Sequence, residues 1–154
     1  MTVRQSIVDA LVTRLKTVTV SNGYASNAGL TVYAWFPENL QVNVLPCILI
    51  RDTADQIEDL SRTVTQHRLS IDVMGFVASG TTTDDAARAL VGDLAKCLMN
   101  PADRTLGGVC DSISMTDGGT IQLEQSSDAT RASVSLGLTV VYRTERGDWS
   151  QQIT

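Results

Sequence analysis

The segment from Arg131 to Arg143 constrains the fold more than any other part of the sequence. Apolar and polar side chains alternate along it with few exceptions. The apolar set comprises Ala132, Val134, Leu136, Leu138, Val140 and Tyr142. Successive side chains of a strand point to opposite faces, so this alternation predicts a strand buried on one face. At roughly 3.3 Å per residue it would reach about 43 Å, and a compact domain of this length has a diameter of about 40 Å. We therefore expect one strand that crosses the whole domain and needs partner strands along its length.

The opposite face of this strand carries small polar side chains, interrupted by Gly137 and Val141. Such a smooth, weakly charged face suits close approach by a helix or by a neighbouring subunit. Glycine within a strand is typical of a bulge or bend. We therefore expect an irregularity of the sheet at Gly137.

Length and composition favour one soluble domain. The chain has 154 residues, 43% of them hydrophobic and 19% charged, which is enough apolar material for a core. The sequence has no apolar run long enough to cross a membrane, and its first residues lack the apolar core of a signal peptide. We expect a single domain over residues 1–154, made in the cytoplasm and without a membrane partner. The net charge of −5 argues against tight nucleic-acid binding.

Two further strands and the acidic segment between them predict a long β-hairpin arm. The run 47–51 is nearly continuously apolar, as in a strand covered on both faces, and 66–77 alternates like the opening segment. The intervening residues, about 53–65, are polar and acidic. An acidic tip gains nothing from burial, so this arm should protrude. Its candidate contact residues are Asp55, Glu58, Asp59 and Arg62.

Two helices are predicted, at residues 3–18 and 81–100. Thr2 and Gln5 have the spacing of a capping box, and Thr82 and Asp85 have its Asp variant. Each segment places apolar side chains three and four residues apart, which forms one apolar face. We expect both helices to pack on the sheet.

The remaining segments complete an α+β pattern. We expect short strands at 31–35, 109–115 and 121–125, with a hairpin turn at 117–119. The C-terminal tail, residues 145–154, is polar apart from Trp149 and Ile153, and an isolated tryptophan there indicates docking on a neighbour. Hairpins are common in this order and crossovers are few. The predicted fold class is therefore α+β, a mainly antiparallel β-sheet with a long hairpin arm, packed by two α-helices.

No converging set of catalytic or metal-binding residues is visible. The single histidine, His67, is interpreted as a residue at a sheet edge or strand end, and the cysteines have no metal-type spacing. Neither glycine pair, at 107–108 or at 118–119, has the pattern of a phosphate loop. We predict free thiols, no catalytic residue, no metal, no cofactor and no enzymatic activity. The three cysteines are Cys47, Cys97 and Cys110.

The order of features resembles the tail terminator proteins of long-tailed bacteriophages (minor tail protein U-like). The features are an N-terminal helix, a strand after Leu45-Pro46, a strand at 62–76, a helix ending near Leu98, the Thr105-Leu106-Gly107-Gly108 turn and a last strand ending at 140–144. The resemblance spans nearly the whole chain. It implies a structural virion protein that forms a hexameric ring on the head-proximal end of the tail tube. Such a ring stops tube polymerisation and offers an attachment surface to the head–tail connector.

The resemblance also implies partners and a location. The partners are further copies of the chain, the tail tube protein, the head–tail connector protein and DNA that passes through the channel without specific binding. The location is the virion tail, and the host cytoplasm during assembly. Candidate interface or channel residues are Asp55, Glu58, Asp59, Arg62 and Trp149. Three alternatives remain: a head–tail connector (tail completion) or tail tube subunit, a small ligand-binding α+β module, and a thiol enzyme.

Overall fold

The computed structural model describes residues 1–35, 44–78, 83–125 and 130–154. Two helices and six strands follow in the order α1, β1, β2, β3, α2, β4, β5, β6, with two short 3-10 helices, η1 and η2, between α1 and β1. Their bounds are α1 Val3–Leu15, η1 Val20–Asn22, η2 Ala28–Leu30, β1 Val32–Ala34, β2 Cys47–Asp59, β3 Val64–Ala78, α2 Thr83–Leu98, β4 Ser112–Gln125, β5 Thr130–Glu145 and β6 Asp148–Gln152.

Strand β5 lies inside the sheet and organises it, as the alternation predicts. The strand order is β1-β2-β3-β5-β4, and β6 pairs with the end of β5. Strand β3 runs antiparallel to β5 from Ala78 opposite Arg131 to Val64 opposite Glu145. Strand β1 is parallel to β2, and the other pairings are antiparallel. The fold is α+β, with a mainly antiparallel sheet packed by two helices.

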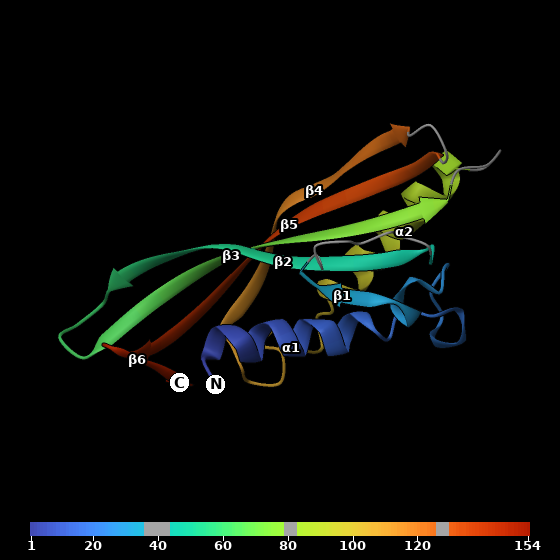
Figure 1. Ribbon diagram of the computed structural model, residues 1–154. Coiled ribbons are helices and arrows are strands. Elements are labelled where there is room, and N and C mark those ends of the chain that lie inside the picture. The colour runs from blue at the N-terminus through green and yellow to red at the C-terminus, as the bar shows by residue number, and fades with distance from the viewer. Residues whose placement is uncertain (36–43, 79–82, 126–129) are drawn as a thin grey trace.

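Both helices contribute to one apolar core on one face of the sheet, which we call the inner face (Figure 1). Helix α2 lies against β3, β5 and β4, and α1 lies against α2, β1, β2 and β6. The predicted inward positions of β5 are all buried, as are Leu69, Ile71 and Val73 of β3. Burying one such aliphatic side chain contributes about 1.5–3 kcal/mol, so this layer dominates the stability of the fold. Neither described helix has the length and apolar content needed to cross a membrane.

The outer face carries a second, smaller apolar cluster at one end. Cys47, Leu49 and Phe76 are buried there, and the guanidinium of Arg131 lies 5.0 Å from the centre of the Phe76 ring. Residues 47–50 are all fully buried. The prediction that this short apolar run is covered on both faces is therefore confirmed.

The arm is an extension of the sheet beyond the helices (Figure 1). Strands β2 and β3 remain paired out to Asp59 opposite Thr65, and β5 continues beside β3 to Glu145. A bulge between Asp52 and Ala54 inserts one residue into β2. Because it shifts the side-chain alternation by one position, Asp52 and Asp55 both project to the inner face.

The prediction of a hairpin turn at 117–119 is wrong. Strand β4 continues through these residues along β5, with register shifts on both sides of Asp117. Local turn chemistry favoured a hairpin, but β5 offers β4 a continuous partner, so the extra residues are absorbed as an irregularity of β4. Gly137 lies opposite, where an added Cβ would come within 3.0 Å of the Thr116 hydroxyl. The expected irregularity at Gly137 thus lies in the partner strand.

The secondary structure at both ends of the chain differs from the prediction. Helix α1 ends at Leu15, and only half of its capping box forms: Thr2 Oγ1 accepts from the Gln5 N–H at 3.2 Å, while the Gln5 side chain bonds Asp9 at 2.8 Å. The residues expected to form a C-terminal tail fold back as β6 after a turn at Gly147, whose φ is +83°. Thr82 lies outside the described residues.

Candidate functional site

A buried polar network lies on the inner face at the root of the arm, with His67 at its centre. The His67 side chain is fully buried. Its Nδ1 lies 2.9 Å from Asp55 Oδ2, and its Nε2 lies 2.9 Å from Thr144 Oγ1. Strand β3 lies between β2 and β5. Of the two places expected for His67, the sheet edge is therefore wrong, while the residue does lie near the first end of β3, at its fourth position.

Two aromatic side chains enclose the His67 ring. Tyr142, its register partner on β5, stacks on it with ring centres 4.3 Å apart and planes 7° from parallel. Trp149 of β6 approaches it edge-on, with ring centres 5.0 Å apart and an interplanar angle of 84°. Such edge-to-face and stacked pairs contribute about 0.5–1.5 kcal/mol each beyond the area they bury. Residues from β2, β3, β5 and β6 thus meet at one point.

Asp55 supplies the negative charge of the network. Its side chain is only 8% exposed. Oδ2 accepts from the Tyr142 hydroxyl at 2.9 Å as well as facing His67. Oδ1 is buried and has no hydrogen-bond partner in the part of the chain that the structure describes. Burial and the bond to Asp55 raise the pKa of Tyr142, so its hydroxyl remains a donor. Within the described residues, one oxygen of the Asp55 carboxylate thus has two partners, and the other has no hydrogen-bond donor.

The hydrogen-bond order Asp55–His67–Thr144 is that of a chain that activates a hydroxyl nucleophile. The Asp55 oxygen accepts a hydrogen bond from His67 Nδ1, and the Thr144 hydroxyl can donate to or accept from Nε2. Thr144, however, is fully buried, and no groove described below reaches it. In this conformation His67 and Thr144 are covered by the protein, and the network links neighbouring strands.

A second acidic site, centred on Asp52, joins β2 to α1. The Asp52 carboxylate receives the Arg4 guanidinium and the Trp35 indole N–H, the latter at 2.6 Å. Burial opposes ionisation of Asp52, but the hydrogen bonds from Arg4 and Trp35 outweigh it, and its pKa is lowered. Trp35 has a φ of +66°, an uncommon value for a residue other than glycine. Both carboxylate oxygens are occupied, so this site is a link between elements.

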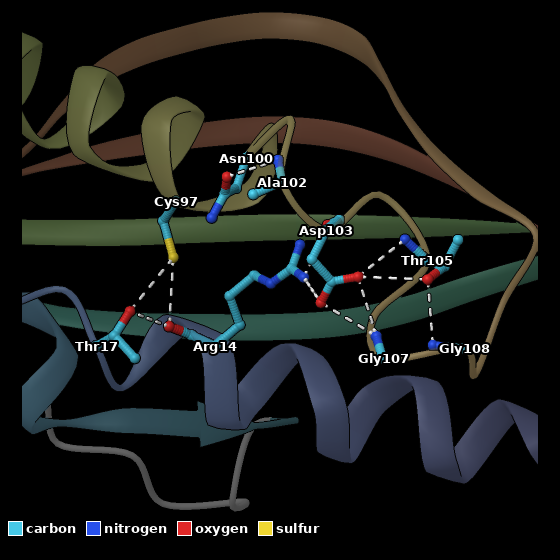
Figure 2. A network of polar contacts seen from close by, with 9 residues as sticks. All are labelled: Arg14, Thr17, Cys97, Asn100, Ala102, Asp103, Thr105, Gly107 and Gly108. Carbon is cyan, nitrogen blue, oxygen red and sulfur yellow. Dashed lines mark hydrogen bonds and ion pairs between the residues drawn. The ribbon is translucent and has the colours of Figure 1, made fainter.

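The loop between α2 and β4 is organised around Asp103 (Figure 2). Its carboxylate receives Arg14 at 2.6 Å and the Gly107 N–H at 3.1 Å, and the Gly108 N–H goes to the Thr105 hydroxyl at 3.2 Å. Asp103 therefore occupies the place that an anion would take in a glycine-rich loop. This agrees with the interpretation that the glycine pair at 107–108 shapes a turn.

The predicted contact residues are not brought together as one surface. Asp55 is buried, while Glu58 and Asp59 are exposed farther along β2. Asp59 accepts from Thr65 at 3.0 Å and pairs with Arg146 at 3.3 Å. Arg62 is exposed in the turn between β2 and β3. The expected grouping of Asp55 with the exposed acidic side chains therefore does not form.

Trp149 is 45% exposed and contacts its own chain at His67.

Sequence reasoning missed His67, Tyr142 and Thr144 as one unit. A signal was present, because His67 shares its alternation with Leu69 and Ile71, and Tyr142 with Leu138 and Val140. Polar side chains on an apolar face imply polar partners. The pairing itself depends on strand register, which alternation does not contain.

The described surface has shallow grooves and no metal centre. One of about 500 Å³ lies on the outer face between Arg51 and Arg131. Another, of about 330 Å³, lies between α1 and the Asp52 site. A third, of about 180 Å³, lies beside the end of α2. Within the described ranges, no three His, Cys, Asp or Glu side chains are arranged to hold a metal ion.

Comparison of the sequence with known protein-family models and with curated proteins found no match.

Proposed function

We propose that the chain is the tail terminator subunit of a long-tailed bacteriophage. Six copies would form a ring that caps the tail tube, stops its polymerisation and receives the head–tail connector. The order of sequence features supports this proposal. It is a structural role, with no catalytic residue and no cofactor.

The observation that carries the proposal is the apolar surface of the arm. Ile57, Leu60 and Trp149 are between 45% and 58% exposed. Ile57 is the register partner of His67, which Trp149 contacts, so these two apolar side chains flank one point on the inner face. Exposed apolar side chains on a projecting element are typical of subunit contacts. An arm of this kind suits assembly with copies or partners better than catalysis.

The exposed acidic side chains of the arm, Glu58 and Asp59, fit a surface beside passing DNA. Like-charge repulsion from phosphates would keep DNA from adhering there. Asp55 is buried, so it has no part in this surface and acts inside the arm. Arg62 and the exposed edge of Trp149 remain candidates for contact with a neighbouring ring.

The test combines solution mass with electron microscopy of mixtures with tail tubes. A terminator forms rings in solution or on tubes, and it appears as a cap at one end of each tube. Filaments formed by the chain alone would instead indicate a tube subunit, and a small fixed species that ignores tubes would indicate a ligand-binding module or an enzyme. Binding to the head connector without tube capping would indicate a tail completion protein.

The double variant Ile57→Ser, Leu60→Ser tests the observation directly. It should fold, because both side chains are half-exposed, and it should lose ring formation or capping. Ile121→Ser, Leu123→Ser is the matched control, because it removes two apolar side chains of similar exposure on β4. Normal capping by the arm variant would remove the support that the arm gives to the proposal.

A further inference from the structure

Strand β6 is attached to the rest of the sheet by few backbone contacts. It pairs with β5 through Thr144 opposite Gln152 and Glu145 opposite Asp148, with an irregularity between the two pairs. The N–H of Ile153 adds a bond of 2.9 Å to the Arg143 carbonyl. The two strands are joined through Gly147 in a left-handed conformation. Few backbone bonds and a glycine at the turn lower the cost of detaching β6, although its packing against α1 must also be given up.

Side chains add one polar clasp to this attachment. Gln152 donates to Asp111 Oδ1 at 3.0 Å, and Arg143 binds both oxygens of the same carboxylate, at 2.8 and 3.2 Å. The side chains of residues 148–151 are exposed. The clasp joins β6 to Arg143 of β5 and to Asp111, whereas the contact of Trp149 with His67 joins β6 to the arm.

Trp149 covers a buried polar site that includes an unpaired carboxylate oxygen within the described part of the chain. His67 is fully buried although Trp149 itself is 45% exposed, so the indole is a thin cover over the ring. Asp55 faces Nδ1 of the same ring, and its buried Oδ1 has no hydrogen-bond partner among the described residues. A buried unpaired acceptor costs about 1–3 kcal/mol, a cost that water would relieve. Water entry therefore favours the open state, and Trp149 opposes it.

The outer part of the arm depends on this cover. Beyond Asp55 the side chains of β2 are exposed, including Ile57 and Asp59 on the inner face. A two-stranded hairpin is at best marginally stable in water, so β2 and β3 need β5 and the aromatic contacts of His67 to remain ordered there. Loss of the Trp149 contact would remove one of the contacts that hold this part of the arm, while the stacking of Tyr142 and the pairing with β5 would remain.

We infer that β6 is a releasable strap, and that docking of its Trp149 on His67 keeps the outer arm ordered. In the docked state Trp149 covers the His67 ring and the outer arm stays paired. In the released state water reaches Asp55 and His67, and the arm opens locally. A partner that contacts Trp149 in only one of these states would shift the equilibrium between them. The inference concerns the arm itself and stands whether or not the proposed function is correct.

Hydrogen exchange, read by mass spectrometry on the full chain, tests the strap. Trp149→Ala should speed amide exchange in residues 56–67 by about tenfold, the effect of losing one aromatic contact, and leave α2 unchanged. Trp149→Phe, which keeps an aromatic edge, should lie between wild type and Trp149→Ala. Leu123→Ala is the control, because this exposed side chain lies on β4. Wild-type exchange in the arm of Trp149→Ala, or an equal increase in Leu123→Ala, would overturn the inference.

A reversible crosslink provides the opposite perturbation. Glu145→Cys with Asp148→Cys places two thiols at a register pair of β5 and β6, and the three native thiols are buried. In sub-denaturing urea, the oxidised form should exchange more slowly than the reduced form in residues 56–67. Equal exchange in the two forms would show that the arm opens without release of β6. This measurement remains decisive if Trp149→Ala loosens the whole fold, which α2 exchange would reveal.

Discussion

Asp55 Oδ2 lies 2.9 Å from His67 Nδ1 and 2.9 Å from the Tyr142 hydroxyl. One carboxylate oxygen thus ties β2 to both β3 and β5 at the base of a projecting arm. A charge buried in this way stabilises only while its partners remain, because removal of one member leaves the others unpaired.

Asp55→Asn should therefore destabilise the protein although the two side chains have the same shape. We expect a loss of about 1–3 kcal/mol in the free energy of unfolding, because the hydrogen bonds of His67 and Tyr142 to a charged oxygen become weaker bonds to an amide. Urea denaturation followed by circular dichroism measures it. Glu58→Gln is the matched control on the same strand. It should change stability by no more than about 0.5 kcal/mol, because that side chain is exposed. Equal stability of the two variants would contradict the role assigned to the network.

The Asp52 site should make stability depend on pH in the acid range. Its folded-state pKa is lowered from 3.8, so the folded state holds this proton less tightly than the unfolded state does. The stabilisation is present above pH 3.8 and is lost as the pH falls from there through the folded-state value.

Asp52→Asn should remove that part of the acid dependence, and Arg4→Gln should reduce it. The free energy of unfolding of each variant and of the wild type is measured as a function of pH in the acid range, and the slopes are compared. The pKa of Asp103 is also lowered, so the wild-type slope has several sources and only the difference between variants isolates Asp52. A slope that is unchanged in Asp52→Asn would refute the assignment.

The three thiols should be inert in the folded protein. Burial raises the pKa of Cys47 to about 11 and of Cys110 to about 12, and it raises the pKa of Cys97 as well. Because the thiolate is the reactive form, a thiol reagent should label none of them until urea unfolds the chain. Rapid labelling of one thiol in the native state would revive the thiol-enzyme alternative.

Replacement by serine should destabilise the protein more at Cys47 than at Cys97. Cys47 packs with Leu49 and Phe76, whereas the Cys97 Sγ donates to the Arg14 carbonyl at 3.3 Å. Cys47→Ser should cost about 1–3 kcal/mol, because its hydroxyl is buried among apolar groups, and Cys97→Ser should cost less because a partner is present. Thermal melts of both variants give the order, and the reverse order would contradict this account.

Two glycines should respond to alanine in opposite directions. A Cβ at Gly29 would lie 2.5 Å from the Leu15 carbonyl oxygen and 2.7 Å from that of Val18, both backbone atoms that cannot turn aside. Gly29→Ala should therefore destabilise by about 1–3 kcal/mol, as overpacking does. Gly92 lies in α2 with open space around it, and Gly92→Ala should stabilise by up to about 1 kcal/mol. The denaturation midpoints of the two variants measure these changes in stability. An unchanged midpoint in Gly29→Ala would contradict the predicted clash, because it would show that the loop relaxes around the added Cβ.

The long strand and both helices could be predicted because their signals are local. Alternation in 131–143 identified a strand and its buried face, and apolar spacing identified the two helices. The turn predicted at 117–119 failed for the same reason, since local turn residues were outweighed by the partner that β5 offers. Strand β6 was missed because its polar residues carry no alternation, and its pairing with β5 supplies what its sequence lacks.

The sequence by itself determined which side chains belong to the sheet's apolar face, because strand periodicity places every second residue on that face. Only the tertiary structure decided which polar side chains on it meet. The bulge at Thr53 brings Asp55 onto the face of His67, and β6 returns Trp149 over the ring. Both depend on register and on contacts between residues far apart in the chain. The strand from Arg131 to Arg143 thus defined the sheet, while the contacts around its end at Tyr142 were set by the fold.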